Sequence, residues 1–111
     1  MATLHAEIGK VLSIIHDRPE EKWTIDSLTK ETAISRTKLF NTFTKAVGIS
    51  PIQYLTNWRI DLSKQRLKTS NLSILEIANS VDYEPEASFG RVFKKIEQIS
   101  PGKFRNNLKP G

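Results

Sequence analysis

The chain has 111 residues, a length that predicts one compact domain (residues 1–111) or at most two very small ones, and its composition of 38% hydrophobic and 26% charged residues excludes a disordered chain. It contains no cysteine, which excludes disulfides and thiolate metal sites, and its longest apolar run, VLSII, is too short for a membrane span. The net charge of +5 favours a polyanionic partner, and we expect a cytoplasmic protein with no membrane contact.

Helical periodicity appears at the start of the sequence. One face of a helix over residues 4–16 is predicted by the apolar residues Leu4, Ile8, Val11, Leu12 and Ile15. Thr24 is a good N-cap for a second helix that ends near Thr32, and Asp26 in its first turn is favourable to the helix dipole. Ile25, Leu28 and Thr32 are predicted to face the core. Ser35 is the N-cap predicted for a third helix over residues 36–47, which Gly48 ends in the left-handed conformation.

A long helix is predicted next, over residues 50–69. Ser50 and Gln53 have the spacing of a capping box, and Pro51 suits the first helical position. Arg59 in this helix has no obvious partner in the sequence, and we expect it to form an internal ion pair.

Three shorter helices complete the chain. Ser73 and Glu76 form a second capping-box pattern, and Pro85 suits the first position of a helix over residues 85–97. A terminal helix is predicted over residues 100–108. Since no segment alternates like a strand, the fold class is predicted as all-α with seven helices.

The second half of the chain repeats the first. Ile25, Leu28, Thr32, Leu39, Phe43, Gly48 and Pro51 correspond to Ile74, Ile77, Val81, Phe89, Phe93, Gln98 and Pro101 at an offset of 49 and then 50. Each copy, residues 24–47 and 73–97, is a short helix, a turn and a longer helix, which is the arrangement of a helix-turn-helix unit. The connecting helix of about eighteen residues would span roughly 27 Å, a suitable length for two units that read neighbouring stretches of DNA.

The segments WTIDSL, GISPIQYL, SFGRVFKK and ISPGKFR carry a family resemblance. Over about residues 6–106 the chain resembles the DNA-binding domain of AraC/XylS-type bacterial transcription regulators. The resemblance implies that the chain binds double-stranded promoter DNA and regulates transcription as an activator or a repressor. It leaves RNA polymerase as a further candidate partner, and we expect the chain to be a monomer. The pattern departs from the family at Ala33, Asp82 and Gln98, where glycine is common, and we expect local strain there.

The predicted base-reading residues of the first unit are Arg36, Thr37, Phe40 and Asn41. Arginine can pair with guanine and asparagine with adenine, and an aromatic edge can meet a thymine methyl group. The resemblance places Thr37, Phe40 and Asn41 at base-reading positions. An alternative for Phe40 is that its ring folds over the edge of the core.

The predicted base-reading residues of the second unit are Glu86, Ser88, Gly90 and Arg91. Arg91 is the best candidate for a base or phosphate contact. Glu86 has an alternative role in stabilising the helix N-terminus. Gly90 would allow a close approach of the backbone, although its presence can also be neutral.

The predicted phosphate contacts are the lysines Lys38, Lys45, Lys94, Lys95 and Lys103. No cofactor or metal site is expected, since His5 and His16 are eleven residues apart on one helix and no phosphate-binding loop or nucleophile motif occurs. We therefore do not expect an enzyme. A second reading is a basic helical protein-interaction module without sequence-specific DNA binding.

Overall fold

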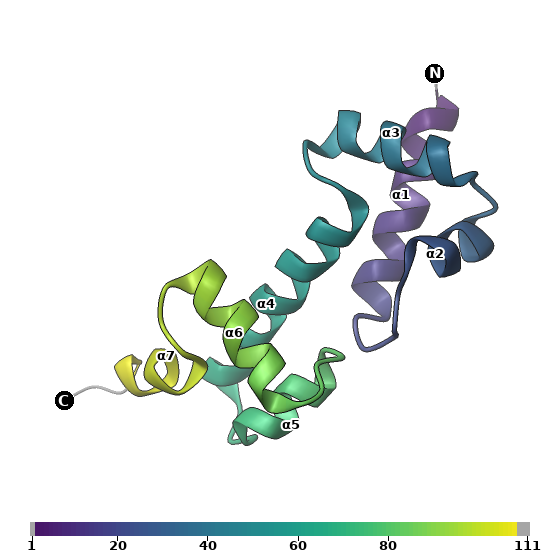
Figure 1. The fold of residues 1–111 in the computed structure, drawn as a ribbon. Helices are drawn as coiled ribbons and strands as arrows, with labels where there is room; N and C mark the ends of the chain where they lie inside the picture. The colour runs from purple at the N-terminus through teal and green to yellow at the C-terminus, as the bar shows by residue number, and fades with distance from the viewer. Residues whose placement is uncertain (1, 109–111) are drawn as a thin grey trace. The chain divides into compact units, whose positions relative to one another are not determined.

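The computed structural model describes residues 2–108, with side chains from Ala6 onward, and within that range it contains seven α-helices and no strand (Figure 1). The helices are α1 (Ala2–Asp17), α2 (Ile25–Thr32), α3 (Arg36–Val47), α4 (Pro51–Thr69), α5 (Ile74–Ser80), α6 (Glu86–Glu97) and α7 (Pro101–Asn107). The all-α prediction is confirmed, and each predicted end lies within two residues of the observed one. None of these helices is both long and apolar enough to cross a membrane.

The chain divides into two compact units, with the boundary inside α4 between Trp58 and Arg59. In unit 1, α2 and α3 pack against each other and both pack against α1 (Figure 1). Its buried core consists of Ile8, Val11, Ile15, Trp23, Leu28, Ile34, Leu39, Phe43 and Leu55. Leu4, predicted on the same face of α1, lies outside the described side chains. The core thus joins the apolar faces of the first three helices and the start of α4, as the periodicity predicts.

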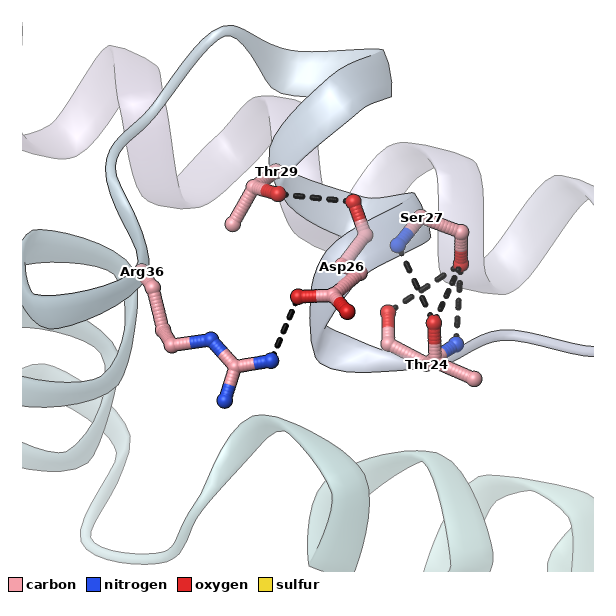
Figure 2. A network of polar contacts seen from close by, with 5 residues as sticks. All are labelled: Thr24, Asp26, Ser27, Thr29 and Arg36. Carbon is pink, nitrogen blue, oxygen red and sulfur yellow. Dashed lines mark hydrogen bonds and ion pairs between the residues drawn. The ribbon is translucent and has the colours of Figure 1, made fainter.

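Helix α2 has a defined cap at each end, and α3 has one at its start. Thr24 and Ser27 form a reciprocal capping box, in which each side-chain oxygen accepts a hydrogen bond from the other's backbone N–H (Figure 2). Ala33 ends α2 with φ 57°, in the left-handed region, and the Ser35 hydroxyl then accepts from the N–H of Lys38 at 3.3 Å. These local bonds fix where α3 begins.

The capping box predicted at the start of α4 is only half formed. The Gln53 N–H donates to the Ser50 hydroxyl at 3.1 Å, as predicted, but the Gln53 side chain donates to Asn57 at 2.9 Å instead of reaching back. The side chain of glutamine lies one turn from position 57 on the same helix face, so this partner competes with the cap.

Unit 2 has its own core. Its buried members are Ile60, Leu67, Ile77, Ala78, Val81, Phe89 and Phe93. Two aromatic contacts link α6 to its neighbours: the ring centre of Phe89 lies 5.9 Å from that of Tyr83, and the ring centre of Phe93 lies 5.5 Å from that of Phe104 of α7. Within α6, the ring centres of Phe89 and Phe93 lie 5.6 Å apart. The second helix-turn-helix unit is therefore held on both sides of α6 by ring packing.

Helix ends in unit 2 follow the sequence pattern with one exception. Ser73 and Glu76 form the predicted capping box, and the Ser100 hydroxyl caps α7. Pro85 was predicted at the first helical position, but it is the N-cap of α6, with extended backbone (φ −75°, ψ 175°), and the helix begins at Glu86. Proline fixes φ near −65° in either position, so the pattern cannot separate the two.

Arginines and lysines in unit 2 also hold its interior polar groups. The guanidinium of Arg59 pairs with Asp82 at 3.4 Å, which confirms the internal ion pair expected for it. Arg66 donates to the backbone and the hydroxyl of Ser80, and Lys64 pairs with Glu97 at 3.1 Å. Part of the positive charge of the second half is therefore used within the unit.

Candidate nucleic-acid interface

The outward face of α3 brings the four predicted residues of unit 1 together. Because Leu39 and Phe43 are buried, the residues on the opposite side of the helix are exposed. The exposed residues are Arg36, Thr37, Phe40 and Asn41. Together with Ile25 at the start of α2, they line a hollow of about 310 Å³.

Phe40 is exposed and does not fold over the core edge. Its side chain is 47% exposed, among the largest values for big apolar residues in the described chain, and it is not a member of the unit 1 core cluster. An aromatic ring on the polar side of an amphipathic helix gains little from folding and is therefore available to a ligand.

Arg36 is held by Asp26 of α2, which the sequence predicted only as favourable to the helix dipole. Its guanidinium donates to the carboxylate of Asp26 on α2, and both side chains remain largely exposed, 66% and 73% (Figure 2). The hydrogen bond from Arg36 and its positive charge hold the pKa of the Asp26 carboxyl below its ordinary value. A contact between Arg36 and guanine would have to compete with this ion pair.

The outward face of α6 is less uniform. Glu86 and Arg91 are exposed, whereas Ser88 and Gly90 are half-buried. The Arg91 guanidinium lies 3.4 Å from the Ser88 hydroxyl, and among the described residues it forms no ion pair with a carboxylate. A Cβ atom added at Gly90 would meet nothing within 4 Å, so the packing of unit 2 itself does not require glycine there.

The five predicted phosphate-contact lysines are all exposed, but they differ in their partners. Lys38 pairs with Glu7 of α1 at 3.1 Å, so this charge is already shared within unit 1. Within residues 2–108, no ion pair engages the other four, which are Lys45, Lys94, Lys95 and Lys103. Lys94 and Lys95 lie on α6, as Arg91 does, and Lys103 lies on α7.

Two residues next to the site were missed from the sequence. Ile25 was assigned to the core, yet it is half-buried and lines the hollow beside Phe40. Asp26 was assigned to the helix dipole, yet it binds Arg36, ten residues away. No periodic pattern links positions on two different helices, so only the folded turn brings these residues together.

The described residues contain no cluster of three or more His, Cys, Asp or Glu side chains that could hold a metal ion. His5 lies outside the described side chains. His16 instead contacts aromatic rings: its Nε2 is 2.7 Å from the Tyr54 hydroxyl, and its ring centre is 4.4 Å from that of Trp58.

The chain is similar to known transcription regulators. A family model described as a helix-turn-helix domain matches residues 28–107. The regulator AlkR of Acinetobacter baylyi is 39% identical over 94% of this chain and 34% of its own length. A putative AraC-like transcription regulator of Streptomyces antibioticus is 33% identical over 93% of this chain and 34% of its own length. The chain thus spans about a third of the length of these relatives.

A solved structure shares the fold. The DNA-binding domain of the transcriptional factor AdpA, crystallised with a target DNA, superposes with a TM-score of 0.86 at 21% identity and covers 90% of each chain. The relatives are named as transcription regulators rather than enzymes. With two helix-turn-helix units and a family model that matches most of its length, this chain belongs to the AraC/XylS family of helix-turn-helix transcription regulators.

Proposed function

We propose that this chain binds double-stranded DNA with sequence specificity and serves as the DNA-binding part of a transcription regulator. In this proposal α3 and α6 are the recognition helices, and each enters a major groove with its outward face. The repetition of the motif supports insertion into two neighbouring grooves. The family supports action in a bacterial cytoplasm, and RNA polymerase is the partner that a transcription activator would contact.

The observation that carries the proposal is the exposed polar face of each recognition helix. On α3, Asn41 and Thr37 present hydrogen-bonding groups, while Leu39 and Phe43 of the same helix are buried. On α6, Arg91 lies relative to the buried Phe89 and Phe93 as Asn41 lies relative to Leu39 and Phe43 on α3. Amides and guanidinium groups are the side chains that read base edges in the major groove.

Charge supports the same assignment. Lys94 and Lys95 lie in the last turn of α6 and Lys103 lies on α7, and all three are exposed. Cations beside a recognition helix can neutralise phosphates on either side of the groove, which positions the helix without selecting a sequence. The target DNA in the AdpA complex is a further support from a protein of the same fold.

The experiment is selection of bound sequences from a randomised duplex library at about 150 mM salt. Two enriched boxes, one lost in an Asn41→Ala variant and the other in an Arg91→Ala variant, are expected if both units read bases. Leu75→Ala is the control, since Leu75 is also exposed but lies on α5 and not on a recognition helix.

The other outcomes are also informative. One enriched box would restrict base reading to the helix whose variant erases it, and the other unit would contribute phosphate contacts only. No enrichment in the unmodified chain would overturn the proposal and favour a protein-interaction module. Sedimentation of the complex would test the expected monomer.

A further inference from the structure

We infer that the hollow between α2 and α3 receives the C5 methyl group of a thymine, so that unit 1 distinguishes thymine from cytosine at one base pair of its site. The hollow is lined by Ile25, Arg36, Thr37, Phe40 and Asn41. This inference rests on the proposed DNA binding and specifies what one part of the interface reads.

The hollow has two apolar lining residues on a face that is otherwise polar. Phe40 is 47% exposed, and Ile25 contributes from the first position of α2. Because these two apolar side chains come from two helices, they line a concave surface that can surround a small group. A lone exposed phenylalanine would form only a protruding surface. In the major groove, the thymine methyl is the only apolar group that a base presents.

The ring of Phe40 is not covered by its charged neighbour. Arg36 lies one turn before Phe40 on the same helix, where a guanidinium can stack on an aromatic ring. Its guanidinium is bound by Asp26 of α2 instead (Figure 2). Among the described residues, cations lie over the rings of Trp23 and Phe104, not over that of Phe40.

A polar group that fits the partner base stands beside the hollow. Asn41 follows Phe40 directly, and its amide can donate and accept in the bidentate pattern that adenine N6 and N7 present. An A·T pair places the thymine methyl and these adenine atoms on the same groove edge. The hollow and Asn41 are therefore suited to one A·T pair or to two neighbouring pairs.

The test is a thymine-to-deoxyuridine scan of the duplex selected from the library, with the unmodified protein. Each substitution removes one methyl and leaves base pairing and hydrogen-bonding groups intact. If one methyl group is buried in the hollow, the substitution at a single position of the box read by α3 should weaken binding roughly three- to tenfold. At that position, Phe40→Ala should lower the thymine-to-uracil ratio to about one, while Leu75→Ala should keep the ratio of the unmodified protein.

A second measurement needs no variant and so does not depend on the folding of Phe40→Ala. With 5-iododeoxyuridine in place of the sensitive thymine, the iodine occupies the methyl position, and irradiation should cross-link the base to Phe40. Mass spectrometry of the cross-linked peptide identifies the residue. A cross-link to α6, or to a residue outside the hollow, would overturn the inference.

The outcomes separate this inference from the proposed function. Enriched sequences with no methyl-sensitive position would overturn the inference alone, as would a folded Phe40→Ala variant that keeps the full thymine-to-uracil ratio. The absence of any enriched sequence would overturn both.

Discussion

The guanidinium of Arg59 lies 3.4 Å from the carboxylate of Asp82, and the two side chains are only 10% and 17% exposed. Asp82 has φ 63°, in the left-handed region that favours glycine. Aspartate accepts this backbone conformation more readily than most residues, and its carboxylate supplies an ion pair that glycine cannot. The departure from the family pattern is thus matched by an arginine on α4.

Replacing Asp82 should destabilise unit 2. Asp82→Ala leaves Arg59 buried without this carboxylate, and we expect a loss of about 2–3 kcal/mol in the free energy of unfolding. Asp82→Gly loses the same ion pair but relieves the left-handed backbone, so its loss should be smaller by about 1 kcal/mol. Urea unfolding measures both. Equal stabilities for Asp82→Ala and the unmodified chain would contradict a stabilising role of the pair.

Ala33→Gly should stabilise unit 1. Ala33 has φ 57° and an exposed side chain, so glycine removes the conformational cost at no loss of packing. After allowing for the greater freedom of glycine in the unfolded chain, we expect a gain of about 0.5 kcal/mol. Ala46→Gly, inside α3 with ordinary helical backbone, is the matched control and should lose about 0.5–1 kcal/mol. A loss at both positions, measured by thermal unfolding, would show that position 33 is not strained.

The Asp26–Arg36 ion pair predicts a pH dependence. The pKa of Asp26 is lower in the folded state than its ordinary value, so folding favours the charged form. The contribution of this ion pair to the free energy of unfolding is therefore complete at pH values above the ordinary pKa of about 4, and it is lost as the pH falls through the lower pKa of the folded state. Asp26→Asn should be less stable than the unmodified chain at neutral pH, and the difference should shrink at low pH. A difference that does not change with pH, in urea titrations at low salt, would contradict this assignment.

Arg105 should be essential to unit 2 although it looks like part of a basic surface. Its guanidinium donates to the carbonyl oxygen of Leu67 in the last turn of α4 at 3.2 Å, and to those of Ser70 and Leu72 just after this helix at 3.2 and 2.6 Å. Arg105→Lys cannot reproduce this fork, and we expect it to cost about 2 kcal/mol. Arg91→Lys is the control and should change stability by less than about 0.5 kcal/mol. Similar stabilities of the two variants would contradict the role of Arg105.

Neutralising Lys94 and Lys95 should weaken DNA binding without changing its specificity. The Lys94→Gln and Lys95→Gln double variant should lose affinity for all duplexes about equally, and the slope of log K against log salt should fall by about 1 to 2. Lys10→Gln, which removes an exposed lysine of α1, should leave the slope nearly unchanged. Fluorescence anisotropy over a salt series measures both quantities. A changed preference between sites with an unchanged slope would assign the two lysines to base contacts instead.

Local chemistry made most of the fold predictable. Caps such as Thr24, Ser35 and Ser73 and the left-handed Gly48 mark helix ends within a few residues of sequence, and the apolar faces repeat every three to four residues. The outward position of Asn41 and Arg91 follows from the same periodicity, since the buried Phe43 and Phe93 fix the inward side of each helix.

The sequence alone therefore determined the seven helices, the repeat and the faces that α3 and α6 turn outward. The tertiary structure decided which charges are engaged: Arg36 by Asp26, Lys38 by Glu7, and Arg105 by the carbonyls that follow α4. It also decided that Ile25 joins Phe40 in one hollow. Helix ends and faces depend on neighbours within about one turn, whereas these contacts join residues 10 to 38 positions apart, which only packing between helices brings together.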